Sequence, residues 1–123
     1  MKRKILIVED DTQSLYMLTF LLESNNYEVI QSNNGADGIL KAKIHHPDAI
    51  ILDIQLPEMD GYKVTRELRI TDEVKNIPII VVTSFAMIGD KNKALEAGAS
   101  GYIEKPINPD TFISQMEAYI IKS

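Results

Sequence analysis

Short runs of consecutive apolar residues recur along the 123-residue chain, and stretches with helical spacing separate them. A strand that is apolar at every position is typical of a parallel sheet that is covered on both faces. Such runs occupy residues 4–8, 49–54, 79–83 and 101–104, and a weaker candidate lies at 27–31. Five strands that alternate with five helices predict an α/β fold, a doubly wound parallel sheet with right-handed crossovers.

The helical stretches are marked by apolar residues three or four positions apart and by residues typical of helix ends. Gly98 is expected to close one helix as a C-terminal cap, and Asn108 followed by Pro109 predicts that the last helix starts near Pro109. The predicted apolar positions are Leu15, Leu18 and Leu22; Ala36, Ile39, Leu40 and Ile44; Val64 and Leu68; Ala94, Leu95 and Ala97; and Phe112, Ile113, Met116 and Ile120.

Composition narrows the class of protein further. With 45% hydrophobic residues and no repeat or linker, residues 1–123 are expected to form one folded domain. The longest apolar run, 77–82, is far shorter than the roughly 20 residues of a membrane span, and we expect no export signal. The lack of cysteine favours a cytoplasmic location, and the net charge of -5 argues against direct nucleic-acid binding or attachment to a membrane surface.

Polar residues gather where the predicted strands end. Ligands of such sheets bind beyond the carboxyl ends of the strands, so these residues should share one rim. Clustered carboxylates must be neutralised by a cation or by protons, and oxygen ligands alone favour magnesium, with manganese as an option. A carboxylate beside such an ion, facing a lysine and a hydroxyl, is typical of a phosphoryl acceptor. The residues are Glu9, Asp10 and Asp11; Asp53; Thr83 and Ser84; and Lys105 with Pro106.

Four ordered motifs carry a family resemblance over the whole chain. They are LIVEDD at 6–11, DIQLPEMDG at 53–61, PIIVVTS at 78–84 and AGASGYIEKP at 97–106. With these motifs the sequence resembles the receiver domain of bacterial and archaeal two-component response regulators. The resemblance implies a flavodoxin-like (βα)5 fold with strand order 2-1-3-4-5.

The resemblance also implies roles for the acidic residues. Asp53 would accept the phosphoryl group as an aspartyl phosphate. The magnesium ion would be bound by Asp10, by Asp53 and by the backbone carbonyl of Gln55, while Glu9 would act through a metal-bound water. Many family members carry Asp where this chain has Glu9, and the metal is still expected to bind.

Three further residues take roles from the same resemblance. Thr83 would hydrogen-bond the phosphoryl group and move inward on activation, Lys105 would form an ion pair with it, and Tyr102 would change rotamer together with Thr83. The Lys105–Pro106 peptide bond is expected to be cis. Gln55 and Phe85 occupy two variable positions that tune the phosphoryl lifetime in the family, and their effect here stays open.

The implied function is a phosphorylation-dependent signalling switch of a two-component phosphorelay. Asp53 would take a phosphoryl group from a phosphohistidine of a sensor histidine kinase or a histidine phosphotransfer protein, without acting as a multiple-turnover enzyme. A downstream protein would bind the face made by the fourth helix, fifth strand and fifth helix. Phosphorylation-dependent homodimerisation is an option. A stand-alone regulator and a segment of a larger hybrid kinase or response regulator both remain open.

Other functions fit the residues less well. Phosphohydrolases of the haloacid-dehalogenase type need a second Asp two residues after the nucleophile, where this chain has Gln55. A flavodoxin-type FMN carrier needs a phosphate-binding loop where acidic residues 9–11 would repel the phosphate. A degenerate receiver that only binds partners is disfavoured by the intact set of site residues. His45 and His46 are interpreted as a polar helix end, because adjacent helical side chains diverge by about 100°.

Overall fold

The structure, a computed structural model, describes residues 2–84 and 89–120 and contains one parallel five-stranded sheet in the order β2-β1-β3-β4-β5. This order confirms the doubly wound, flavodoxin-like arrangement expected from the sequence. The strands are β1 (Lys4–Val8), β2 (Glu28–Ser32), β3 (Ala49–Leu52), β4 (Ile79–Thr83) and β5 (Gly101–Glu104).

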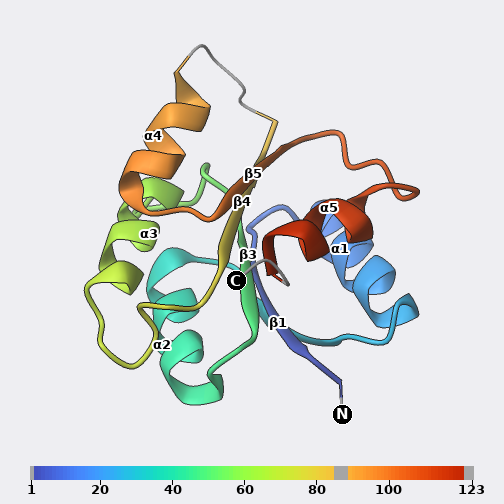
Figure 1. The fold of residues 1–123 in the computed structure, drawn as a ribbon, viewed down its shortest axis with the longest axis horizontal. Helices are drawn as coiled ribbons and strands as arrows, with labels where there is room; N and C mark the ends of the chain where they lie inside the picture. The colour runs from blue at the N-terminus through green and yellow to red at the C-terminus, as the bar shows by residue number, and fades with distance from the viewer. Residues whose placement is uncertain (1, 85–88, 121–123) are drawn as a thin grey trace.

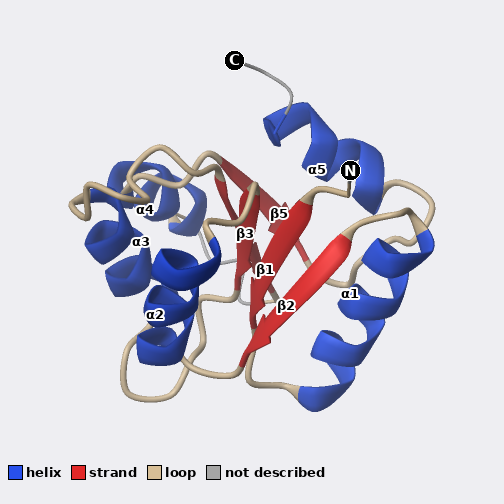
Figure 2. Cartoon of the chain, turned by 90° about the horizontal axis from the view of Figure 1, so that it is seen from below, coloured by secondary structure: helices blue, strands red, loops and turns tan. Residues whose placement is uncertain are grey.

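Helices cover both faces of the sheet and make a three-layer molecule (Figure 1). Figure 2 shows α1 and α5 on one side of the strands and α2, α3 and α4 on the other. The helices are α1 (Thr12–Ser24), α2 (Gly35–His45), α3 (Gly61–Arg69), α4 (Asp90–Ala97) and α5 (Phe112–Ile120). Within the described ranges, no helix has the combination of length and apolar sequence that crossing a membrane requires.

Two of the predicted strands have different ends in the structure. The strand expected over 49–54 stops at Leu52, because the carbonyl of Ile54 accepts hydrogen bonds from the backbone N–H groups of Leu56 and Gly61 and the chain turns there. The strand expected over 27–31 is shifted by one residue. The N–H of Tyr27 still bonds to the carbonyl of Leu22 at the end of α1, so β2 begins at Glu28.

The last helix also begins later than its sequence suggests. The carbonyl of Asn108 accepts from the N–H groups of Thr111 and Phe112, and its side chain accepts from the N–H of Asp110. Residues 109–111 therefore form a turn, and α5 starts at Phe112 instead of near Pro109. The predicted end of α4 is confirmed, because Gly98 takes the left-handed conformation with φ 114° and caps the helix.

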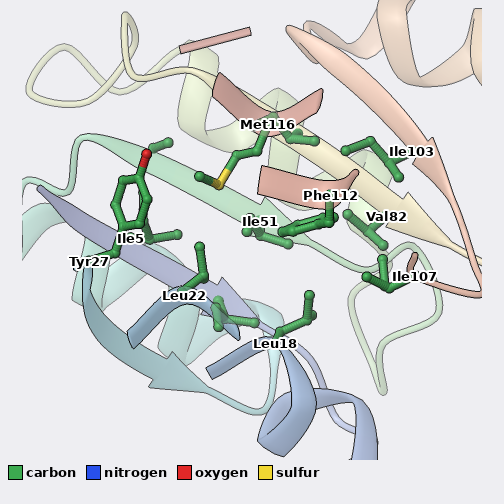
Figure 3. Packing of buried hydrophobic residues seen from close by; sticks show 13 residues of the cluster. Ile5, Leu18, Leu22, Tyr27, Ile51, Val82, Ile103, Ile107, Phe112 and Met116 are labelled. Atoms are coloured by element: carbon green, nitrogen blue, oxygen red, sulfur yellow. The ribbon is translucent and has the colours of Figure 1, made fainter. Parts of the chain in front are cut away.

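The larger buried cluster lies between the sheet and the α1/α5 layer. Figure 3 shows side chains of β1, β3, β4 and β5 meeting those of the two helices. Every described position of β3 and β4 is buried, which explains why these strands are apolar throughout and do not alternate. The labelled members are Ile5, Leu18, Leu22, Tyr27, Ile51, Val82, Ile103, Ile107, Phe112 and Met116.

On the opposite side of the sheet, α2 packs through small residues. Gly35, Gly38 and Ala42 are its buried positions, and a Cβ atom added at Gly38 would lie 2.8 Å from a methyl group of Val8. Leu40 and Ile44 are instead 55% and 62% exposed. The apolar spacing of α2 therefore predicts a helix correctly, but two of its large residues do not face the core.

Tyr27 links the start of β2 to α5. Its ring is buried, and its hydroxyl donates a hydrogen bond to the Glu117 carboxylate. Burial and this carboxylate raise the pKa of Tyr27 to about 12. The bond is therefore intact at neutral pH and connects α5 to the segment between α1 and β2.

We expect Tyr27→Phe to lower the free energy of unfolding by about 1 to 2 kcal/mol, because it leaves the partly buried Glu117 carboxylate without this donor. Urea unfolding monitored by circular dichroism would measure the change. Tyr16→Phe is the matched control, since the Tyr16 side chain is 73% exposed. Equal stability of wild type and Tyr27→Phe would show that the bond does not hold α5.

Candidate functional site

Backbone hydrogen bonds fix the residues that directly follow three strands. The N–H of Glu9 donates to the carbonyl of Ser32, and the N–H of Asp53 donates to the carbonyl of Val8. The N–H of Lys105 likewise donates to the carbonyl of Thr83. The sheet pairing thus extends one residue past these strands and brings their side chains to one rim, as expected for a parallel sheet.

Three carboxylates come together at this rim. One oxygen from each of Glu9, Asp10 and Asp53 lies within 4.8 Å of the others. Glu9 and Asp53 are buried, with 2% and 8% of their surface exposed, whereas Asp10 is exposed. Three negative charges this close repel each other, and a hard divalent cation with oxygen ligands fits the donor set.

Lys105 is the cation next to these carboxylates. Its Nζ atom lies 2.7 Å from Oε1 of Glu9 and 3.7 Å from Oδ2 of Asp53, and it also donates to the hydroxyl of Ser14 at 3.4 Å. Desolvation alone would lower the pKa of Lys105, but the hydrogen bond with Glu9 and the charges of Asp53, Glu9 and Asp11 outweigh it and raise the pKa. Lys105 therefore stays charged and is paired with Glu9, and its ion pair with a phosphoryl group stays a prediction.

Both oxygens of Glu9 have protein partners. Oε1 accepts from Lys105, and Oε2 accepts from the backbone N–H of Asp11 at 3.1 Å. Burial raises the pKa of Glu9 and the Lys105 ion pair partly offsets this, while the nearby Asp53 carboxylate raises it further. Contact with a metal through water stays a prediction for this residue.

The structure gives Asp11 a role in helix capping and places Ser84 at the surface. Asp11 is the N-cap of α1, where its carboxylate accepts from the N–H of Ser14 at 2.9 Å. Hydrogen bonding from the Ser14 side chain, and then from this N–H, lowers the pKa of Asp11. The N-cap of α4 is Gly89, so Ser84 does not cap that helix. Ser84 is exposed at the rim instead.

The loop after Asp53 holds the carboxylate of this residue from the side of α3. The N–H of Gln55 donates to Oδ1 of Asp53 at 3.3 Å. Gly61, the first residue of α3, packs so closely that an added Cβ atom would lie 2.5 Å from the Asp53 carbonyl oxygen and 2.7 Å from the Cα atom of Ile54. The glycine is required here for close approach of two backbone segments.

Thr83 and Tyr102 lie on the α4 side of the sheet. Val81 pairs with Tyr102 in the parallel register, and Thr83 follows Val81 by two positions, so both side chains share the face of Val81. Thr83 is fully buried, while Tyr102 is half-buried against an apolar cluster that contains Ile54. The structure therefore brings the two predicted switch residues to neighbouring positions.

A cleft of about 670 Å³ opens above this rim. It gives access to Asp53 from solvent and is bordered by α1 and by the segment after β5. Sequence reasoning missed the α1 residues Ser14 and Met17 and the buried Ile107, since only their packing reveals them. The full lining is Asp10, Asp11, Ser14, Met17, Asp53, Gln55, Ser84, Lys105, Pro106 and Ile107.

The other predicted features have clear positions. The Lys105–Pro106 peptide bond is cis, as expected. His45 and His46 are exposed at the end of α2, and His46 adopts the left-handed conformation as its C-cap. Phe85, one of the two tuning positions, lies outside the described residues.

Comparison with known proteins agrees with this geometry. A family model described as the response regulator receiver domain matches residues 5–117. The polar-differentiation response regulator DivK of Brucella anthropi is 40% identical over 120 residues, which are 98% of each chain, and the DivK protein of Brucella ovis is 39% identical with the same coverage.

Solved structures are similar over nearly the full length. The receiver domain of a Pseudomonas aeruginosa sensor histidine kinase, in which a magnesium ion is coordinated in the active site cleft, has a TM-score of 0.91 at 31% identity and covers 99% of this chain and 100% of its own. The chemotaxis response regulator CheY4 of Vibrio cholerae has a TM-score of 0.91 at 28% identity, covering 97% of this chain and 99% of its own.

Proposed function

The chain belongs to the response regulator receiver domains, the phosphorylation-dependent switches of two-component signalling, and we propose that Asp53 is its phosphoryl acceptor. The observation that carries this proposal is the position of the Asp53 carboxylate. It lies in the cleft beside the carboxylates of Glu9 and Asp10, and the ammonium group of Lys105 is 3.7 Å away.

In the proposed reaction, a carboxylate oxygen of Asp53 attacks the phosphorus atom of a phosphohistidine. A P–O bond to Asp53 forms, the P–N bond to the donor imidazole breaks, and the imidazole leaves with the bonding electron pair. The backbone N–H of Gln55 orients one oxygen of Asp53, which leaves the other for attack. Lys105, whose Nζ atom lies 3.7 Å from Oδ2 of Asp53, would stabilise the negative charge of the transferring group.

The acidic residues fit a magnesium ion, with manganese as the alternative. Asp10, Asp53 and the backbone carbonyl of Gln55 would hold it, and Glu9 would reach it through water. When bound, the ion would offset the charge that develops on the phosphoryl oxygens. The three grouped carboxylates of Glu9, Asp10 and Asp53 offer oxygen ligands, which are the ligands that a hard divalent cation prefers.

In the proposed switch, Thr83 and Tyr102 pass the signal from Asp53 to the α4 side of the sheet. Thr83 would hydrogen-bond the phosphoryl group, and its inward movement would open space for the Tyr102 ring. This change would alter the face formed by α4, β5 and α5, where a downstream protein or a second copy of the chain would bind. The phosphoryl donor would be a sensor histidine kinase or a histidine phosphotransfer protein, the partners with which receiver domains work.

The proposed role is that of a switch and not of a multiple-turnover phosphohydrolase. The side chain two residues after the acceptor is the amide of Gln55, which cannot act as a general acid for repeated turnover. Self-phosphorylation and slow loss of the phosphoryl group at Asp53 would be its chemistry.

We expect the protein to gain one phosphoryl group from acetyl phosphate when magnesium is present and none when a chelator is added. Intact-mass spectrometry would measure this gain in wild type, in Asp53→Asn and in Asp72→Asn. Asp72 is a suitable control because its side chain is 92% exposed in the segment after α3. Labelling of Asp53→Asn at the wild-type level would remove Asp53 from the proposed role.

A further inference from the structure

The first residue of α4 is connected to α3 by a side-chain hydrogen bond. The hydroxyl of Tyr62, the second residue of α3, donates to Oδ1 of Asp90 at 3.3 Å. Asp90 begins α4 and is only 8% exposed. The residue before it, Gly89, has no side chain with which to cap the helix, so a contact made by Asp90 helps to place this end of α4.

Tyr62 packs in the same apolar cluster as Tyr102. The buried members of this cluster come from β4, from α4 and from the segments around them, and the two tyrosine rings complete it at its edge. Burial, followed by the nearby charge of Asp90, raises the pKa of Tyr62 to about 12, and the same two causes raise the pKa of Tyr102. The charge of Asp90 therefore acts on both hydroxyls, and the hydroxyl of Tyr62 also donates to it. The buried members are Ile54, Val81, Ala94 and Ala99.

The opposite end of α4 is connected to α3 through Arg69. The guanidinium of Arg69, at the end of α3, donates to the carbonyl of Gly98 at 2.7 Å and to the hydroxyl of Ser100 at 3.2 Å. The same group donates to the carbonyls of Lys75 and Ile77 at 3.0 and 2.7 Å. The Gly98 end of α4 is thus tied to α3 and to the segment after it, whereas the Asp90 end meets α3 through the longer Tyr62 bond.

We propose that Tyr62 is a regulatory residue of the switch, whose hydrogen bond to Asp90 stabilises the resting position of the first turn of α4. The proposal rests on the proposed function, because it takes phosphorylation of Asp53 to be the event that moves Tyr102. Displacement of the Tyr102 ring changes the packing of the cluster that Tyr62 shares. The Asp90 end of α4 then moves away from Tyr62 and the bond breaks, while Arg69 keeps the Gly98 end in place.

This arrangement makes a prediction about affinity. An interaction that exists only in the resting state opposes every ligand that favours the activated state, and its removal tightens the binding of that ligand by the same factor. A single hydrogen bond of ordinary strength corresponds to a change of about two- to tenfold. Tyr62→Phe removes the hydroxyl and keeps the ring in the cluster.

The test is titration of beryllofluoride, a phosphoryl mimic, into wild type, Tyr62→Phe and Tyr16→Phe with excess magnesium, followed by NMR. We expect Tyr62→Phe to bind the mimic about two- to tenfold more tightly than wild type, and the exposed control Tyr16→Phe to bind it equally. Unchanged or weaker binding by Tyr62→Phe, with wild type binding normally, would overturn only the proposed role of the Tyr62–Asp90 hydrogen bond. Failure of wild type itself to bind the mimic would overturn the proposed function and, with it, the proposed role of the Tyr62–Asp90 hydrogen bond.

Hydrogen exchange measured without the mimic gives a second readout. It separates a local effect of Tyr62 on the first turn of α4 from a general loss of stability. Tyr62→Phe should speed the exchange of amides in the first half of α4 and leave those near Gly98 and in β4 unchanged. Faster exchange throughout the molecule would show that Tyr62 only supports the fold, which contradicts the proposal.

Discussion

Metal-free protein carrying Asp53→Asn is expected to be more stable than wild type by about 1 to 2 kcal/mol. Oxygens of Glu9, Asp10 and Asp53 lie within 4.8 Å of one another. At an effective dielectric constant near 20, two charges at this separation repel by about 3 kcal/mol before salt and solvent reduce the value. The substitution removes the repulsion of Asp53 by two carboxylates. It also removes the attraction between Asp53 and Lys105, which is weaker than that between Glu9 and Lys105 because the distance is 3.7 Å and not 2.7 Å.

Thermal unfolding in chelator and again in excess magnesium would measure this effect. Magnesium should stabilise wild type by mass action and stabilise Asp53→Asn much less, because the variant has lost a ligand. The exposed control Asp72→Asn should behave as wild type in both conditions. If Asp53→Asn melts below wild type in chelator and magnesium raises both equally, the three carboxylates do not form a metal pocket.

Gly61→Ala is expected to lower the free energy of unfolding by about 1 to 3 kcal/mol and to slow phosphorylation of Asp53 strongly. The new methyl group would lie 2.5 Å from the Asp53 carbonyl oxygen. Since the obstacle is backbone, it cannot be relieved by rotating a side chain. Either α3 moves away from the sheet, or the backbone that carries the acceptor carboxylate shifts.

Gly38→Ala is the matched control for this substitution, because the atoms nearest to its added methyl group belong to the side chain of Val8 and not to the backbone. Urea unfolding and the rate of labelling by acetyl phosphate would be measured for both variants. We expect Gly38→Ala to keep labelling near the wild-type rate. Wild-type labelling by Gly61→Ala would mean that the close approach of α3 does not position Asp53.

The rim of the sheet could be predicted from sequence because the topology leaves few choices. Fully apolar runs indicate a parallel sheet, parallel strands share one carboxyl edge, and so residues after each run must meet. Glu9, Asp53, Thr83 and Lys105 are brought together in this way by backbone pairing. The motif order added the strand order 2-1-3-4-5, which spacing alone does not supply.

Contacts within the site were harder to predict, since they depend on side-chain reach. The sequence does not show that Lys105 pairs with Glu9 at 2.7 Å and lies 3.7 Å from Asp53. It also gives no sign that the tyrosine of α3 meets the first acidic residue of α4, because these residues are 28 positions apart and lie on different elements. Three-dimensional packing alone brings such pairs together.

The buried face of α2 shows a different limit. Hydropathy ranks Leu40 and Ile44 as core residues, yet both are exposed, and glycine and alanine make the contact with β1. Close approach of a helix to a sheet favours small residues, and a pattern built on large apolar side chains overlooks them. The helix was predicted correctly from its period, but the face that it buries was not.

The central claim is that Asp53 itself receives the phosphoryl group, and chemical trapping tests it most directly. Protein phosphorylated in magnesium would be reduced with borohydride, which converts an aspartyl phosphate to homoserine, and its peptides would be sequenced by mass spectrometry. We predict homoserine at position 53 and unchanged aspartate at Asp10 and Asp11. Homoserine at another aspartate, or a phosphoryl group carried by His45 or His46, would contradict the account.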